Sequence, residues 1–367
     1  MELNPRLIKE TFSYVERHSD EAIGYFYGRL FAEYPRLRQL FPPALDVQRD
    51  RLFAALTRVV FSLDNPESLS TYLAALGRDH RKFGVTAEHF EAVGKALIVT
   101  LCKYAGTAWS AEAEAAWAAA YAEAADMMIK ASEAEDTPPW WDAQVVEHEL
   151  RRPDIAVVTL RPGQPLPYEP GQYVSVQTTR WPRVWRTFSI ANAPRPDHLL
   201  RLHVRALPGG WVSGTLANHT KPGDTVLLGA ARGSMVLDAA SGGDLLCVAG
   251  GTGLAPIKAL VEQVVRSGRR RGVQLFVAAR TQADLYDMPD LERLRASYPW
   301  LDIRPVVSAG PGEDGQDSLV STLREQAGAP GGDAYVCGPE PMTRAITTLL
   351  RELGVPPARI HHDLGGF

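Results

Sequence analysis

The first third of the chain spaces its apolar positions with the period of an α-helix. Ile8, Phe12 and Val15 are separated by four and three residues, and the stretch 52–63 repeats this spacing with Leu and Val. Such spacing puts apolar side chains on one helix face that packs on a core. A Phe-Pro-Pro break at 41–43 divides the helices, because proline cannot continue one. We therefore expect an all-helical domain over residues 1–136.

The pattern changes after Trp140. Residues 156–160 and 173–176 are rich in β-formers. From Leu200 to Arg205 apolar residues alternate with polar ones, His203 among them, which predicts a half-buried strand. The segment between these halves, EAEDTPPWWD, is charged, then proline-rich, then aromatic, a composition typical of a domain boundary.

A strand, a glycine turn and a helix follow one another near the middle of the second half. Residues 244–249 predict a parallel strand, which leads into Gly250-Gly251-Thr252-Gly253 and an apolar helix through Val265. This arrangement turns backbone amides and the positive end of a helix dipole toward an anion. The segments LFVAARTQADLYD and AYVCGPEPM place further motifs at strand ends, the edge where open α/β sheets bind ligands.

Composition and charge exclude several classes of protein. The 367 residues, 45% hydrophobic and 22% charged, predict two or three soluble globular domains. The net charge of -4, without a Lys/Arg run, argues against nucleic-acid binding. The sequence has no apolar run long enough to predict a membrane-spanning helix. Its first residues lack the apolar stretch of a signal peptide. Three scattered cysteines indicate a reducing, cytoplasmic setting, and we expect a monomer or weak homodimer.

His80 is the candidate metal ligand of the helical half. It follows Leu76 by four residues and Leu73 by seven, so it shares their apolar face. A histidine there is either a satisfied core residue or an iron ligand, since neutral imidazole binds iron and leaves the opposite axial position open. Gln48 and Leu52 share a face of another helix.

The segments YFYGRLF, RQLFP, QRDRLF, LGRDHRKF and HFEAVGKAL, in this order, resemble the globin domain of flavohaemoglobins. The resemblance implies that His80 holds the iron of haem b and that Phe41 stacks on the haem. It also implies a distal side formed by Tyr27, Gln48 and Leu52, where O₂ binds. Tyr27 and Gln48 are the catalytic residues expected in this domain, with the tyrosine hydroxyl bonded to bound oxygen.

Two positions depart from the family pattern. Phe90 and Ser132 stand where relatives usually have a tyrosine and a glutamate that polarise the proximal histidine. Phe90 has no hydroxyl, and the neighbouring Glu133 is rotated by about 100° on a helix of 3.6 residues per turn. We therefore expect residues around the proximal histidine to influence the iron less than in relatives. We also expect the haem to bind oxygen rather than to cleave the oxygen–oxygen bond as a peroxidase does.

The order YEPGQYV, RTFSIANAP, PGGWVSGTL resembles the flavin-binding barrel of the ferredoxin–NADP reductase superfamily. It implies an antiparallel β-barrel over residues 137–240 that binds FAD. Arg186 would pair with the pyrophosphate and Thr187 would belong to the same cofactor-binding segment. Phe188 would lie against the isoalloxazine ring, and Ser189, the third expected catalytic residue, would bond near the atom that receives hydride. Backbone amides would come to phosphate from Gly209, Gly210, Val212 and Ser213.

The glycine turn and the two later motifs resemble the NAD(P)H-binding half of that superfamily, which implies an α/β domain over residues 241–367. NADH or NADPH would lie on Gly251, Thr252 and Gly253, with the nicotinamide bordered by Cys337, Gly338 and Pro339. Cys337 equally fits a small buried hydrophobe. Arg280 would contact a 2′-phosphate or only the diphosphate, and ARTQADLY favours NADH. Phe367, displaced relative to the family's usual ending, would cover the flavin.

The flavohaemoglobin resemblance implies that hydride reaches FAD, that single electrons then reach the haem, and that O₂ and nitric oxide react there to give nitrate. Three alternatives remain open at this point. They are an NADH oxidase, a haem-based redox or gas sensor, and a haem-free flavin reductase component of a monooxygenase.

Overall fold

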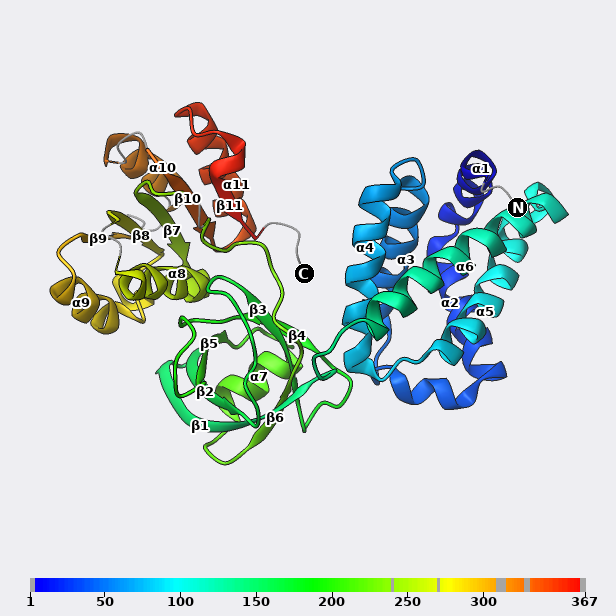
Figure 1. Ribbon diagram of the computed structural model, residues 1–367, viewed down its shortest axis with the longest axis horizontal. Helices are drawn as coiled ribbons and strands as arrows, with labels where there is room; N and C mark the ends of the chain where they lie inside the picture. The colour runs from blue at the N-terminus through cyan, green and yellow to red at the C-terminus, as the bar shows by residue number, and fades with distance from the viewer. Residues whose placement is uncertain (1–3, 239–240, 269–270, 308–314, 327–330, 364–367) are drawn as a thin grey trace. The chain divides into compact units, whose positions relative to one another are not determined.

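The computed structural model describes residues 4–238, 241–268, 271–307, 315–326 and 331–363 (Figure 1). The chain divides into two compact units, Met1–Trp140 and Trp141–Phe367. The expected fold class is confirmed: an all-helical domain is followed by a nearly closed antiparallel barrel and a parallel α/β domain. None of the described helices has the length and apolar character needed to cross a bilayer.

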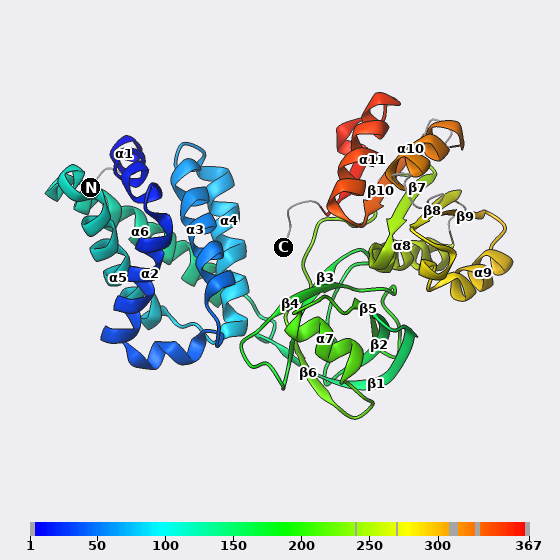
Figure 2. The same ribbon diagram turned by 180° about the vertical axis from the view of Figure 1, so that it is seen from behind.

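The first unit consists of α-helices joined by short 3₁₀ turns, seen from both sides in Figures 1 and 2. Its elements are α1 (Pro5–Glu16), α2 (Ser19–Glu33), η1 (Pro35–Leu40), α3 (Asp46–Phe61), α4 (Pro66–His80), η2 (Arg81–Phe83), α5 (Ala87–Ala105), η3 (Gly106–Ala108) and α6 (Ala111–Glu133). The break expected at Phe-Pro-Pro separates η1 from α3.

Helix α4 is capped at its N-terminus and packs closely on α6. Asn65 caps it by accepting a bond from the Ser68 amide at 3.1 Å, and proline occupies its first position. In its interior Gly77 lies so close to α6 that a Cβ there would be 2.2 Å from the Met128 carbonyl oxygen. The helix ends at His80, so this close packing on α6 sets where the imidazole stands.

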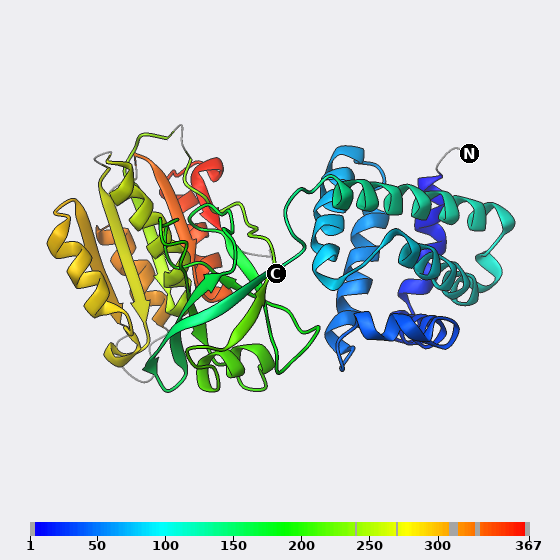
Figure 3. The same cartoon turned by 60° about the horizontal axis from the view of Figure 1, so that its bottom comes forward.

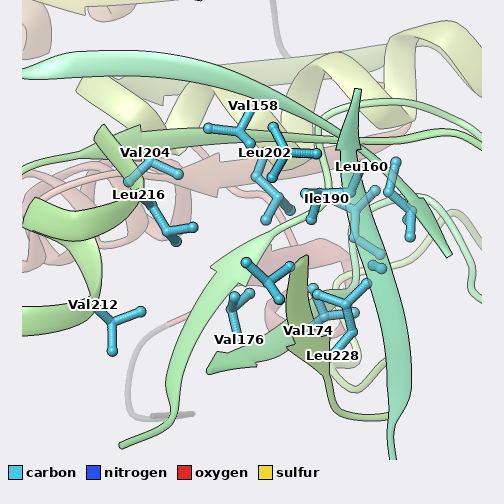
Figure 4. Packing of buried hydrophobic residues seen from close by; sticks show 14 of the residues in the cluster. Val158, Leu160, Val174, Val176, Ile190, Leu202, Val204, Val212, Leu216 and Leu228 are labelled. Carbon is cyan, nitrogen blue, oxygen red and sulfur yellow. The ribbon is translucent and has the colours of Figure 1, made fainter. Parts of the chain in front are cut away.

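The second unit begins with an antiparallel sheet that closes on itself into a barrel. In sheet order its strands are β4 (Arg186–Ser189), β3 (Tyr173–Thr178), β6 (Thr225–Leu228), β1 (Trp141–Arg152), β2 (Ile155–Pro162) and β5 (Leu200–Arg205). A bridge between Ile190 and Leu202 joins the two edges. Helix α7 (Trp211–Asn218) packs Val212 and Leu216 into the apolar core (Figure 4).

The remainder of the unit is a parallel sheet between two helical layers (Figure 3). In sheet order the strands are β11 (Ile360–His362), β10 (Asp333–Cys337), β7 (Leu245–Gly250), β8 (Val273–Ala279) and β9 (Leu301–Val307). Alternate residues of β7 enter two separate cores. One core contains α8 (Leu254–Ser267) and α9 (Met288–Ser297), and the other α10 (Gly315–Gln326) and α11 (Glu340–Glu352). The 3₁₀ turns are η4 (Gly251–Gly253), η5 (Gln282–Asp284) and η6 (Pro357–Arg359).

One strand differs from its predicted pattern. The alternation in β5 places His203 on a polar face, but the side chain is 4% exposed. Its Nδ1 lies 2.7 Å from the hydroxyl of Tyr286, which is also buried. Nearby, the buried Lys258 ammonium pairs with Asp287 at 2.6 Å and with Asp290 at 3.2 Å. The face of β5 that would meet water in an isolated barrel is covered by the nucleotide domain, so a polar residue is buried there.

We expect the second unit to lose stability as the pH falls below about 6.5. Burial, followed by the charges of Lys258 and Arg151, holds the pKa of His203 well below its ordinary value of 6.5. In acid the unfolded chain binds a proton at this residue that the folded chain does not bind, so acid favours unfolding. The loss should be about 1 kcal/mol for the first pH unit below 6.5.

Urea unfolding of the full chain and of His203→Asn, at about pH 7.5 and about pH 5.5, measures this loss. The asparagine amide can still bond to Tyr286 but does not titrate, so the variant should lose less stability between the two conditions. Asp363 acts in the opposite direction, because burial raises its pKa to about 6. That contribution is common to both proteins and cancels. Equal losses in the two proteins would assign the acid sensitivity to other groups.

Candidate cofactor-binding sites

The His80 ring is held in the tautomer that suits a metal ligand. Its Nδ1 lies 2.7 Å from the Leu76 carbonyl oxygen, one turn earlier in α4. A carbonyl only accepts, so Nδ1 carries the proton and the lone pair is left on Nε2. Leu76 is the hydrogen-bond partner of this ring among the described residues. Burial lowers the pKa of His80, against the smaller effect of the Leu76 bond, so the imidazole is neutral.

Helix α3 presents an apolar face that the described chain only partly covers. Of its 16 residues, Val60 alone is buried, while Leu52, Phe53 and Leu56 are half-buried and pack at the margin of the globin core. A helix with this many large apolar residues normally buries them. A flat apolar group bound beside α3 would remove that surface from water, and the unprotonated Nε2 of His80 would suit as a ligand for its iron. These residues fit a haem.

An aromatic cluster packs around the ring of Tyr27 in α2. Tyr27 is 3% exposed, and its ring packs on Phe31 and edge-on against Phe41, with centroids 5.7 and 5.6 Å away. The hydroxyl donates to the Gln48 backbone carbonyl at 3.4 Å, a long bond. Burial raises the pKa of Tyr27, so it keeps its proton. The structure thus brings Tyr27, Gln48 and Phe41 together.

Arg38 fixes Phe41 and was not singled out from the sequence. Its guanidinium donates to the carbonyl oxygens of Phe41, Pro42 and Pro43 at 3.2, 2.9 and 2.8 Å. The two prolines have no backbone N–H that could donate a hydrogen bond within this turn. The guanidinium of Arg38 stabilises the turn instead, by donating to its carbonyl oxygens. The only sequence signal is an arginine three residues before Phe41, which is too common to identify such a role.

The two positions that depart from the family pattern belong to α5 and α6. Phe90 and Ser132 are half-buried and Glu133 is exposed. The backbone carbonyl of Phe90 accepts a bond at 2.6 Å from Tyr121 of α6. That hydroxyl is therefore engaged with the backbone, and the described hydrogen bond of the His80 ring runs from its Nδ1 to the Leu76 carbonyl.

Strand β4 carries the expected flavin motif on an edge of the barrel. Ser189 lies opposite Tyr173 of β3, and Phe188 is half-buried against the barrel core. Thr187 and Ser189 are also half-buried. Arg186 is exposed, and its guanidinium donates to the Trp185 carbonyl at 2.8 Å, which holds its stem against the chain. A half-buried aromatic and hydroxyl beside an exposed guanidinium fit a flavin and its pyrophosphate.

The turn before α7 leads into a helix start, where the first amides have no acceptor within the helix; within the turn, the Gly210 amide donates to the Leu207 carbonyl at 2.9 Å. Gly209 has φ +69°, a conformation that side chains other than glycine's disfavour. A Cβ on Gly210 would lie 2.3 Å from the Ser213 hydroxyl oxygen, which itself accepts a bond from the Leu207 amide at 3.3 Å. Val212 and Ser213 point inward and are buried. The backbone of this turn is therefore free to approach an anion closely.

The two nucleotide motifs expected at strand ends meet in space. A Cβ on Gly253 would lie 2.3 Å from the Cys337 carbonyl oxygen and 2.7 Å from the Gly338 nitrogen. A Cβ on Gly250 would lie 3.0 Å from Cδ of Pro339. Gly251 and Thr252 stand between them in η4. Burial raises the pKa of Cys337 to about 12, so its thiol stays protonated and suits a wall of the site rather than a nucleophile.

A buried carboxylate lies near this cysteine at the C-terminal end. Oδ2 of Asp363 is buried without a hydrogen-bond partner among the described residues, and burial raises its pKa to about 6. An orphaned carboxyl oxygen fits a site that a cofactor completes. Arg280 follows β8 and is exposed. Phe367, expected to cover the flavin, lies outside the described residues.

The structure adds Arg205, at the end of β5, to the nucleotide site. A Cβ on Gly251, whose φ is +54°, would lie 3.5 Å from Nη1 of Arg205. The same guanidinium pairs with Asp154 at 3.4 Å. A cation from the barrel thus faces the glycine turn of the other domain. In the sequence it is only the polar end of an alternating strand, so nothing there signals this position.

Three protein families match successive parts of the chain. They are the globin family at residues 24–128, an oxidoreductase FAD-binding domain at 142–237 and an oxidoreductase NAD-binding domain at 247–348. The flavohemoprotein of Bordetella pertussis is 30% identical, with 98% of this chain and 97% of that protein covered. The flavohemoprotein of Deinococcus radiodurans is also 30% identical, over 96% and 94%.

Two further likenesses concern the fold and the second unit. The crystal structure of a flavohemoglobin from Malassezia yamatoensis, with bound FAD and heme, superimposes with a TM-score of 0.77 at 19% identity, covering 98% of this chain and 97% of that one. That likeness shows the fold. The ferredoxin–NAD(P)(+) reductase component of a Pseudomonas putida naphthalene 1,2-dioxygenase system is 34% identical over 60% of this chain and 67% of that protein.

Proposed function

This chain belongs to the flavohaemoglobin family, and on that premise we propose that it oxidises nitric oxide to nitrate with O₂ and electrons from NADH. As a member it is an oxidoreductase that uses haem b, FAD and NADH or NADPH, and it transfers electrons from NAD(P)H through FAD to haem. The globin match and the full-length relatives decide against the haem-free reductase. We propose domain limits of 1–136, 137–240 and 241–367. We also propose that the protein is cytoplasmic.

The observation that carries the proposal is the buried hydroxyl of Tyr27. The Tyr27 ring packs on Phe31 and Phe41, and its hydroxyl donates to the Gln48 carbonyl at 3.4 Å, a long bond, with the Gln48 side chain also in hydrogen-bond reach. Both partners belong to Gln48, and the bond to its carbonyl is long, so the hydroxyl can turn to a ligand that gains negative charge. When bound, haem supplies the iron at which O₂ and nitric oxide react, and FAD turns a two-electron hydride into single electrons. Tyr27 would donate a hydrogen bond to O₂ at this site, with Gln48 beside it, and His80 would hold the iron.

In the second unit we propose that the motif residues described above bind FAD and the nicotinamide nucleotide. Arg186 and the amides of the turn before α7 hold the pyrophosphate, while Phe188 and Ser189 orient the flavin. Gly251–Gly253 accept the dinucleotide, and the protonated Cys337 borders the nicotinamide as a neutral wall. Arg205 adds positive charge at the glycine turn.

Replacing Tyr27 by phenylalanine tests the proposal. A hydrogen bond to a charged group contributes about 1.5–3 kcal/mol, so oxygen should dissociate roughly 10- to 150-fold faster from Tyr27→Phe. Nitric oxide consumption at low O₂ should fall accordingly in stopped-flow assays with NADH. Tyr25→Phe is the matched control: this residue is in the same helix, but its ring packs on Tyr104 and it is half-buried.

The same assay separates the remaining alternatives. An NADH oxidase would consume NADH and O₂ at a rate that nitric oxide does not raise, and nitrate would not form. A redox or gas sensor would complete a single reduction and then stop. Nitrate formation that is unchanged in Tyr27→Phe would remove the tyrosine from the mechanism.

A further inference from the structure

Two tryptophans on the barrel form a partly exposed aromatic stack. The indoles of Trp181 and Trp211 lie with ring centroids 4.7 Å apart and an angle of 20° between their planes. Trp181 is half-buried, whereas Trp211 remains 38% exposed. Since Trp181 covers one face of the Trp211 ring, the exposed surface lies on the side turned away from it. A tryptophan so exposed leaves a flat apolar surface in contact with water.

The segment that carries Trp181 is held in place by several bonds. The indole Nε1 donates to the Thr215 hydroxyl of α7 at 3.1 Å, and the backbone amide donates to the Thr178 carbonyl at 3.1 Å. Two residues later Arg183 has φ +66°, and its amide donates to Oε1 of Gln177 at 2.6 Å. Non-glycine residues persist in that conformation only where the surroundings enforce it. The loop therefore has a fixed shape that holds one indole on the other.

The stack lies directly beside the phosphate site. Trp211 is the first residue of α7, immediately after the Gly209–Gly210 turn, at the helix start whose first amides have no acceptor within the helix. Trp181 precedes the pyrophosphate arginine, Arg186, by five residues of a short loop. FAD joins its flavin to adenosine through the pyrophosphate, so an anion held at this turn, with the flavin on β4, leaves the adenosine to continue past the start of α7.

We propose that Trp181 and Trp211 form a stacking platform for the adenine ring of FAD, and so make the barrel selective for FAD over FMN. Purine rings stack on indoles, and a base on an aromatic side chain gains about 1–3 kcal/mol, or roughly 5- to 150-fold in affinity. The nicotinamide nucleotide is a poorer candidate for this surface, because its glycine turn is in the parallel sheet, and both tryptophans belong to the barrel.

Flavin titrations of the full chain test the platform. The full-length protein is freed of flavin and titrated with FAD and, separately, with FMN, which has the flavin and a phosphate but no adenosine. Trp211→Ala should weaken FAD binding about tenfold to a hundredfold and leave FMN binding at the parent level. Trp211→Phe keeps an aromatic ring and should restore part of the FAD affinity. Trp140→Ala, at a residue 36% exposed elsewhere, is the control for losing an exposed tryptophan.

A second readout follows the adenine itself. ADP should quench the tryptophan fluorescence of the flavin-free parent and have less effect on Trp211→Phe and Trp181→Phe. Loss of FAD and FMN binding by the same factor would show that the tryptophans only support the phosphate turn, and would overturn the platform. Unchanged FAD binding in Trp211→Ala would overturn it as well.

Discussion

Replacing His80 by alanine is expected to abolish haem retention and with it the consumption of nitric oxide. The imidazole is the protein ligand that we assign to the iron, and its Nε2 lone pair is left free by the bond from Nδ1 to the Leu76 carbonyl. Loss of a mere outer-shell partner of a metal costs about 10- to 100-fold, so loss of the ligand should cost more than about a hundredfold. The Soret band of the purified protein and stopped-flow nitric oxide uptake measure the two effects.

The second unit should be unaffected, so NADH should still reduce the flavin of His80→Ala. His89→Ala is a matched control, since that imidazole is also half-buried but serves to cap α5 by accepting from the Thr86 amide at 3.0 Å. Its loss should cost about 1 kcal/mol of stability and leave the Soret band in place. Imidazole added to His80→Gly should restore haem binding in part. A normal Soret band in His80→Ala would place the iron ligand elsewhere.

The helices and strands were predictable because their signals are local. The spacing of Ile8, Phe12 and Val15 describes a face of α1 that is buried in the structure, and the proline pair after Phe41 ends η1 as expected. Gly77 carries no such signal. A helical glycine is usually a weakness, and this one is necessary only because α6 packs so closely that a Cβ would lie 2.2 Å from a backbone oxygen.

The site residues likewise divide into those that a local sequence signal predicts and those that it does not. His80, Tyr27 and the glycine turn lie in motifs that can be read in order along the chain. Arg205 and Asp363 act across long sequence separations, and the pairing of His203 with Tyr286 joins barrel strand β5 to the turn before α9. An alternating strand predicts which side chains leave the barrel core, but not that another domain covers them. The roles of these residues can therefore be recognised only from the structure, in which the barrel and the nucleotide domain pack together.

Replacing Gly253 by alanine is expected to separate the two loops of the nucleotide site and to slow flavin reduction by NADH at least about a hundredfold. The added Cβ would lie 2.3 Å from the Cys337 carbonyl oxygen and 2.7 Å from the Gly338 nitrogen. Both are backbone atoms and cannot rotate away, so the strand end or the glycine turn must shift. A displacement of about 1 Å is enough to cost this much in a reaction that depends on the alignment of hydride donor and acceptor.

Anaerobic stopped-flow mixing with NADH measures the flavin step, and dithionite provides a control because it reduces the haem without the nucleotide site. Gly331→Ala is the matched variant, since a Cβ there meets nothing within 4 Å in the same domain. It should reduce its flavin at the parent rate, and the Soret band should be unchanged in both variants. Because the glycine itself has an ordinary helical φ of -59°, backbone strain cannot explain a slow Gly253→Ala. A parent-like rate in that variant would mean that the two loops need not touch for hydride to pass.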